Sequence, residues 1–184
     1  SKIVFVDLKK TGNKIGYIPG AGDKVASSLI QVGYYVTELT DELLAKSDLS
    51  QFDAIVAGIR AFNTNDRLPI YYQKLMDFVL QGGNLIVQYN TNNRFAPITE
   101  EIGPYPFTIS RDRVTVDDAE VTFVNPTHPV LNTPNVITQA DFDNWIQERG
   151  IYFASEIDAN YETVFSMHDP GEEPSEGSLI IGKY

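Results

Sequence analysis

The chain contains no cysteine. This absence excludes a disulfide, a zinc–thiolate site and a thiol nucleophile. Histidine is also scarce: only His128 and His168 are present, and neither has a second histidine at the spacing of a metal site. We therefore expect no metal, no cofactor and no thiol-based catalysis in this chain.

Basic residues are few. The chain has 14 Lys and Arg against 25 Asp and Glu, so its formal net charge is −11. A surface of this sign is repelled by nucleic-acid phosphates and by anionic lipid, so we expect neither as a partner. Long apolar runs are missing too, and none approaches the ~18 residues of a membrane span.

The remaining composition is that of an ordinary globular protein. Hydrophobic residues make up 42% of the 184 positions, which is enough for one core without staples. We find no repeat and no linker, so we predict a single domain over residues 1–184. The chain begins at Ser1 without an initiator Met, so we expect a fragment or a processed chain, and localisation cannot be read from the sequence.

The first half alternates between apolar runs and helical patterns. Apolar residues recur at positions 71, 75, 78 and 79, a spacing that predicts a helix over residues 67–81, closed by two glycines. Such a rhythm with short links favours a parallel sheet wrapped by helices, an α/β fold. The other expected elements are strands at 3–8, 14–18, 34–39, 52–59 and 84–89, a helix from 25 to 32 and a short helix beginning at 40.

The rhythm changes after Tyr89. Six prolines fall within residues 90–135, so we predict a loop-rich insertion over about 92–136 with a small antiparallel element. Thr138 is expected to cap a helix in which Phe142, Trp145 and Ile146 share one buried face. Two further strands are expected, at 161–167 and 178–181.

Polar residues follow the predicted strands that end at Ile59 and Tyr89. Because a right-handed crossover sets these strands side by side, their loops should open at the same edge of the sheet. Asn offers paired donors and acceptors, Arg a fixed fork and Tyr a stacking face, a mixture that suits a polyhydroxylated ligand. Alternatively, the Asn side chains satisfy only their own loop backbones. The candidate ligand-binding residues are Arg60, Asn63, Tyr89, Asn90, Asn92 and Arg94, with Arg111 and Arg113 from the insertion.

Several stretches resemble a known family. They are GYIPGAGD (16–23), FDAIVAGIRAFNTN (52–65), GGNLIVQYNTN (82–92), GPYPFTISRDRVT (103–115), WIQERG (145–150) and HDPGEEP (168–174). Together they resemble the class I glutamine amidotransferase-like domain found C-terminal to the deacetylase domain of bacterial PIG-L/LmbE-type proteins. The resemblance implies a flavodoxin-like sheet with helices on both faces and a deacetylase domain as partner. It is compatible with a periplasmic or extracellular bacterial protein.

The resemblance also implies what this chain lacks. Active members of the family carry a Cys at the sharp turn after the strand that here ends at Tyr89, where this chain has Asn90 and Thr91. Thiolate-based glutamine hydrolysis is therefore excluded. The companion deacetylase carries an His-Pro-Asp-Asp run, which the sequence following His128 does not match, so zinc-dependent deacetylation would belong to another part of the protein.

Three functions remain open. The first is a non-catalytic accessory domain that binds a carbohydrate-like ligand or the partner domain. The second is a structural spacer whose loops bind nothing. The third is a carboxylate-dependent hydrolase acting on a glycan or related small molecule, with acid–base roles for Glu148, His168, Asp169 or Glu172.

Overall fold

The computed structural model describes residues 7–92, 98 and 101–184. Within them lies a four-stranded parallel sheet of order β2-β1-β3-β4, so the predicted α/β class is confirmed. Most of the expected strand at 3–8 lies outside the described residues, and residues 7 and 8 are not in a strand. The strands are β1 (Lys14–Ile18), β2 (Tyr35–Glu38), β3 (Ala54–Ala57) and β4 (Asn84–Val87).

The helices begin and end at residues whose chemistry suits those positions. Thr40 caps its helix by accepting a hydrogen bond from the Leu43 amide, and Gly33 and Gly82 terminate theirs with φ of 93° and 94°. The predicted helix 67–81 starts with a 3-10 turn before it becomes α-helical. The helical elements are α1 (Val25–Gln31), α2 (Asp41–Lys46), 3-10 helix η1 (Leu49–Gln51), α3 (Ala61–Thr64), 3-10 helix η2 (Leu68–Tyr71) and α4 (Tyr72–Leu80).

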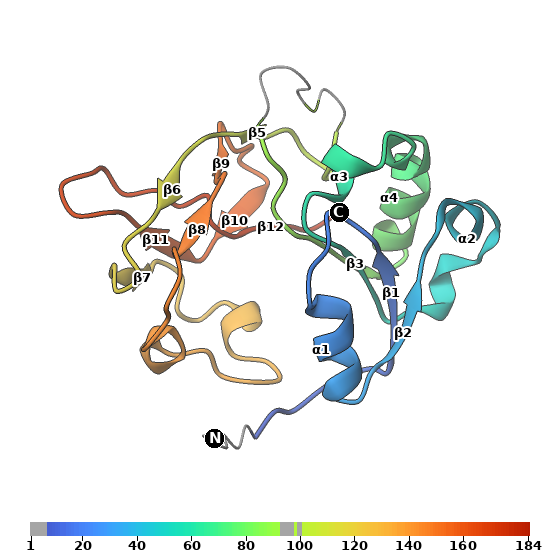
Figure 1. Ribbon diagram of the computed structural model, residues 1–184, viewed down its shortest axis with the longest axis horizontal. Helices are drawn as coiled ribbons and strands as arrows, with labels where there is room; N and C mark the ends of the chain where they lie inside the picture. The colour runs from blue at the N-terminus through green and yellow to red at the C-terminus, as the bar shows by residue number, and fades with distance from the viewer. Residues whose placement is uncertain (1–6, 93–97, 99–100) are drawn as a thin grey trace.

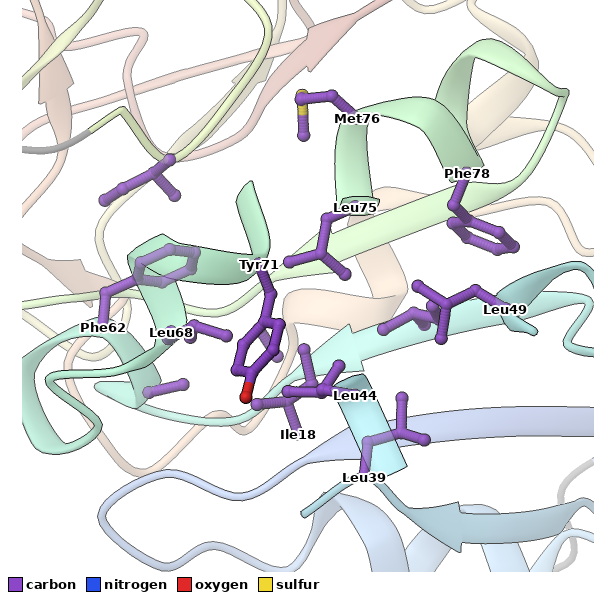
Figure 2. Packing of buried hydrophobic residues seen from close by; sticks show 14 of the residues in the cluster. Ile18, Leu39, Leu44, Leu49, Phe62, Leu68, Tyr71, Leu75, Met76 and Phe78 are labelled. Carbon is purple, nitrogen blue, oxygen red and sulfur yellow. The ribbon is translucent and has the colours of Figure 1, made fainter. Parts of the chain in front are cut away.

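Helices cover both faces of the sheet. On one face Ile15, Tyr17 and Val56 pack against residues of α1. On the other, Ile18 and Ile55 join the larger core with α2 and α4. Alternate residues of each strand therefore face opposite layers, as expected of a sheet buried on both sides. Figure 2 shows this larger core, where Leu44, Leu68, Tyr71 and Leu75 are among the side chains packed with Ile18.

The rest of the described chain is built from short antiparallel pairs. Figure 1 shows them beside the parallel sheet, with β6 to β11 on one side of the molecule and β1 to β4 on the other. The pairs are β5 (Thr108–Ile109) with β9 (Ala154–Ser155), β6 (Arg113–Val114) with β8 (Gly150–Ile151), β7 (Val121–Phe123) with β11 (Phe165–Met167), and β10 (Tyr161–Thr163) with β12 (Ile180–Gly182).

These pairings bear on the segment 92–136, predicted as an insertion. Its strands β5, β6 and β7 pair with strands from residues 150–167 and not with one another. A second buried cluster, which includes Val114, Val121 and Phe165, joins the two segments. The segment therefore pairs with strands nearer the C-terminus. We refer to β5 to β12 together, residues 108–182, as the antiparallel part.

The prediction of a helix after Thr138 is wrong. Thr138 and Asp141 do form a capping box, but only one 3-10 turn follows, η4 (Gln139–Phe142); a shorter one, η3 (Pro129–Leu131), precedes it. The chain turns extended at Asp143 and then left-handed at Asn144, with φ of 57°. Trp145 is consequently 43% exposed and not in the core. The expected strand 161–167 is also divided, because β10 and β11 pair with different partners.

Candidate ligand-binding cavity

The loops after β3 and β4 lie side by side at the carboxyl edge of the parallel sheet. Ala57 is paired with Val87 at the strand ends, and the Arg60 amide donates to the Tyr89 carbonyl at 2.9 Å. The turn formed by Tyr89, Asn90 and Thr91 therefore lies at the edge where ligands bind in open parallel sheets, as the sequence predicts.

The Asn side chains in these loops are engaged with backbone groups. Asn63 donates to the Thr91 carbonyl at 3.1 Å and accepts from the Thr91 amide at 2.8 Å. Asn90 is buried; it accepts from the Phe62 amide and donates to the Gln88 carbonyl, both at 3.1 Å. Asn92 donates to the Ile109 carbonyl at 2.7 Å. These contacts shape the loops, so the amides at these positions hold the backbone in place.

A second hydrogen-bond centre at the same edge is the Asp23 carboxylate. One oxygen accepts from the Tyr17 hydroxyl at 2.9 Å, the Ile59 amide at 3.0 Å and the Gln88 side chain at 3.2 Å. The other accepts from the Val25 amide at 2.8 Å. Asp23 thus ties the start of α1 to the ends of β1, β3 and β4.

The protonation states of Asp23 and Tyr17 follow from their contacts. Burial acts to raise the pKa of Asp23, but the hydrogen bonds from Ile59, Val25, Tyr17 and Gln88 outweigh it, so the pKa lies below its usual value. Burial, followed by the hydrogen bond to Asp23 and its charge, raises the pKa of Tyr17 to about 12. At neutral pH the pair is a carboxylate and a neutral phenol.

A cavity of about 390 Å³ lies between this edge and the antiparallel part. Val79, Leu85 and Val87 form its apolar wall on the side of α4 and β4, and Tyr89 and Asn90 extend that wall to the carboxyl edge. Residues 148–154 and 177–180 form the opposite wall. A largely apolar wall with a few polar groups is typical of small-molecule sites, and the volume lies in their usual range.

Tyr89 and Tyr152 face one another from the two walls. Their rings are near-parallel, 9° apart, with centroids separated by 6.3 Å. Tyr152 has φ of 59°, an unusual conformation for a bulky side chain that concentrates at turns and functional sites. Tyr89 remains 41% exposed, so the tyrosine pair keeps aromatic surface available at the cavity.

The other predicted site residues are dispersed. Asn92 lines a second cavity of about 310 Å³, and Arg111 and Arg113 line a third of about 550 Å³. Arg60 is exposed and Asn63 half-buried, and neither lines any of these three cavities. Arg94 lies outside the described residues. Of the predicted ligand-binding residues that the structure describes, only Tyr89 and Asn90 line the first cavity.

The acid–base candidates are also dispersed. Glu148 lines the first cavity, whereas His168 and Glu172 line the third. Asp169 is buried and accepts hydrogen bonds from the Thr115 amide and hydroxyl and from the Val116 amide. The Val116 hydrogen bond is the largest factor that holds the pKa of Asp169 below its usual value. Its carboxylate is thus engaged in fixing the backbone after β6.

Arg113 is engaged as well. Its guanidinium contacts both carboxylate oxygens of Glu172, at 2.6 and 3.0 Å, and lies 3.6 Å from Asp169. The hydrogen bond to Glu172 is the largest factor that raises the pKa of Arg113. The guanidinium nitrogens that could bind a ligand anion are therefore occupied by the Glu172 carboxylate.

Sequence reasoning missed the wall of the cavity opposite Tyr89. Tyr152 and Ser178 come from turns in the antiparallel part, and their place beside β4 depends on tertiary pairing. The hydroxyl oxygen of Ser178 is buried without a hydrogen-bond partner among the described residues. No spacing or motif distinguishes these two positions in the sequence.

The described residues contain neither a metal-binding cluster nor a membrane-spanning helix. Within residues 7–92, 98 and 101–184, no group of three or more acidic or histidine side chains is arranged to hold a metal ion. In the same residues, no helix has the length and apolar character needed to cross a membrane. No protein-family model, curated protein or solved structure matches the chain.

Proposed function

We propose that this chain is a non-catalytic binding domain whose cavity beside Tyr89 takes a carbohydrate-like small molecule. The observation that carries the proposal is the tyrosine pair at a cavity of about 390 Å³. An aromatic face binds the apolar face of a ring, and polar groups around it then fix the orientation of hydroxyls.

The proposal includes the amidotransferase-like resemblance and its flavodoxin-like fold. In its support, the strand order β2-β1-β3-β4 equals the first four positions of the flavodoxin order 2-1-3-4-5. The turn at Tyr89 lies where the resemblance implies the nucleophile, and the chain has no Cys to place there. A deacetylase domain of the same protein is the proposed partner, and the binding domain would hold its ligand without reacting with it.

Calorimetry on the purified chain tests this function. Methyl glucoside, methyl glucosaminide and methyl N-acetylglucosaminide are the probes, and Tyr89→Ala is the variant. We expect at least one probe to bind, and Tyr89→Ala to weaken it by about tenfold, equivalent to about 1.4 kcal/mol. Tyr35→Ala is the matched control, because Tyr35 is 75% exposed on the opposite edge strand, β2. Absence of binding by all three probes, or equal binding by Tyr89→Ala and wild type, would contradict the proposal.

A further inference from the structure

The charged side chains at the cavity differ in whether they already have partners within the protein. Only two residues with charged side chains, Glu148 and Arg149, line it among the described residues. Arg149 is already engaged: its guanidinium donates to the carbonyls of Ala119 and Phe142 at 3.0 and 2.8 Å. It also lies 5.9 Å from the ring centre of Trp145. These contacts direct the cation toward the antiparallel part.

Glu148 has no such partner. Its side chain is exposed, and among the described residues no Lys, Arg or His nitrogen lies within 4 Å of its carboxylate. The carboxylate is therefore the charge that the cavity can offer to a ligand. The net charge of −11 adds to the attraction of cations.

The aromatic walls favour the same sign of charge. The faces of tyrosine rings attract cations such as a protonated amine. Three tyrosines, Tyr89, Tyr152 and Tyr161, line this cavity.

We propose that the ligand carries a protonated amine, bound between the Glu148 carboxylate and the tyrosine faces, so that the cavity selects an amino sugar over its neutral counterparts. This proposal rests on the function proposed above. The preferred ligand is distinguished by its positive charge. A neutral or anionic sugar would leave the Glu148 carboxylate unpaired.

The three methyl glycosides separate this proposal from the general one, since they share a ring and differ at one substituent. At about pH 7 the glucosaminide is largely protonated, and we expect it to bind at least about tenfold more tightly than the glucoside or the N-acetylglucosaminide. Glu148→Gln should reduce this preference to less than about twofold, and an ionic strength of about 0.5 M should weaken it in the wild type.

Glu173→Gln is the matched control, because it removes the same charge from an exposed position on the third cavity. Thermal unfolding of both variants checks that they are folded. Equal affinity for the three glycosides, with the loss in Tyr89→Ala retained, would overturn the amine proposal and leave the binding function standing. An equal loss of preference in Glu148→Gln and Glu173→Gln would also overturn it. No binding of any glycoside would overturn both.

Discussion

The side chain of Asn63 and the backbone of Thr91 exchange two hydrogen bonds, at 3.1 and 2.8 Å. Asn63 lies in α3 after β3, and Thr91 follows β4. The amide thus continues the pairing of the two strands beyond the point where their backbone ladder ends. This contact holds the Tyr89 turn against the loop that begins at Arg60.

Replacing Asn63 with alanine removes both bonds and leaves the Thr91 amide without this partner. We expect the free energy of unfolding to fall by about 1–3 kcal/mol, measured by urea denaturation. Gln31→Ala is the control, because Gln31 is an exposed amide at the end of α1. An Asn63→Ala loss no greater than that of Gln31→Ala would show that the contact does not hold the loops together.

The carboxylate of Asp23 should make stability depend on pH. Its folded-state pKa lies below the ordinary value of 3.8, so its contribution is fully present above that value and is lost as the pH falls through the folded pKa. Asp23→Asn should cost about 1–3 kcal/mol at neutral pH, and the difference from wild type should shrink below about pH 4.

Denaturation curves recorded across the acid range check this expectation. Asp118→Asn, at an exposed position, corrects for the general effect of removing one negative charge. A constant difference between wild type and Asp23→Asn at all pH values would contradict the proposed role of the ionised carboxylate.

Replacing Gly20 or Gly22, both in the loop between β1 and α1, with alanine should have different effects. A Cβ at Gly20 would lie 2.0 Å from the Ile59 carbonyl oxygen, whereas one at Gly22 meets no atom within 4 Å but has an unfavourable φ of 99°. Gly20→Ala should therefore displace the loop after β3, and Gly22→Ala should only strain its own turn. Amide chemical shifts of residues 59–61 and 88–90 should change in Gly20→Ala alone. Equal changes in both variants would be inconsistent with the close approach.

Asp169 should contribute more than Glu172 to the thermal stability of the protein. Asp169 accepts several hydrogen bonds in a buried position, while Glu172 forms an exposed ion pair with Arg113. Asp169→Asn should lower the melting temperature clearly, and Glu172→Gln should change it little, since exposed ion pairs contribute weakly. Thermal unfolding followed by circular dichroism compares the two, and an equal decrease would argue against this division.

The parallel sheet could be predicted because its signals are local. The run 54–57 is apolar without interruption and forms β3, and the apolar spacing from Tyr71 to Val79 forms η2 and α4. Gly82 ends the helix of residues 67–81 as expected. In each of these segments, local preference and tertiary packing favour the same structure.

The antiparallel part could not be predicted in this way. Its strands are two or three residues long, and they pair across separations of up to 47 residues, as between Thr108 of β5 and Ser155 of β9. Such short runs carry little periodicity. At Thr138 the capping signal is real, but the left-handed residue Asn144 ends the segment after one 3-10 turn.

The site was predicted only at its edge. The placement of Tyr89 and Asn90 follows from strand order, which the sequence implies. Among the described residues, the predicted Arg and Asn side chains do not converge on one cavity. Asn63, Asn90 and Asn92 bond to backbone groups, and Arg113 pairs with Glu172. These pairings depend on distances that a residue-type argument does not supply.

The most direct measurement is a ¹⁵N amide chemical-shift titration of the whole chain with methyl glucosaminide. Binding in the cavity beside Tyr89 predicts saturable shifts at residues 88–90, 148–154 and 177–180, which form its walls. Shifts confined to residues 111–113 and 172–176, which line the third cavity, would contradict this placement. The absence of any saturable shift would contradict binding of this amino sugar.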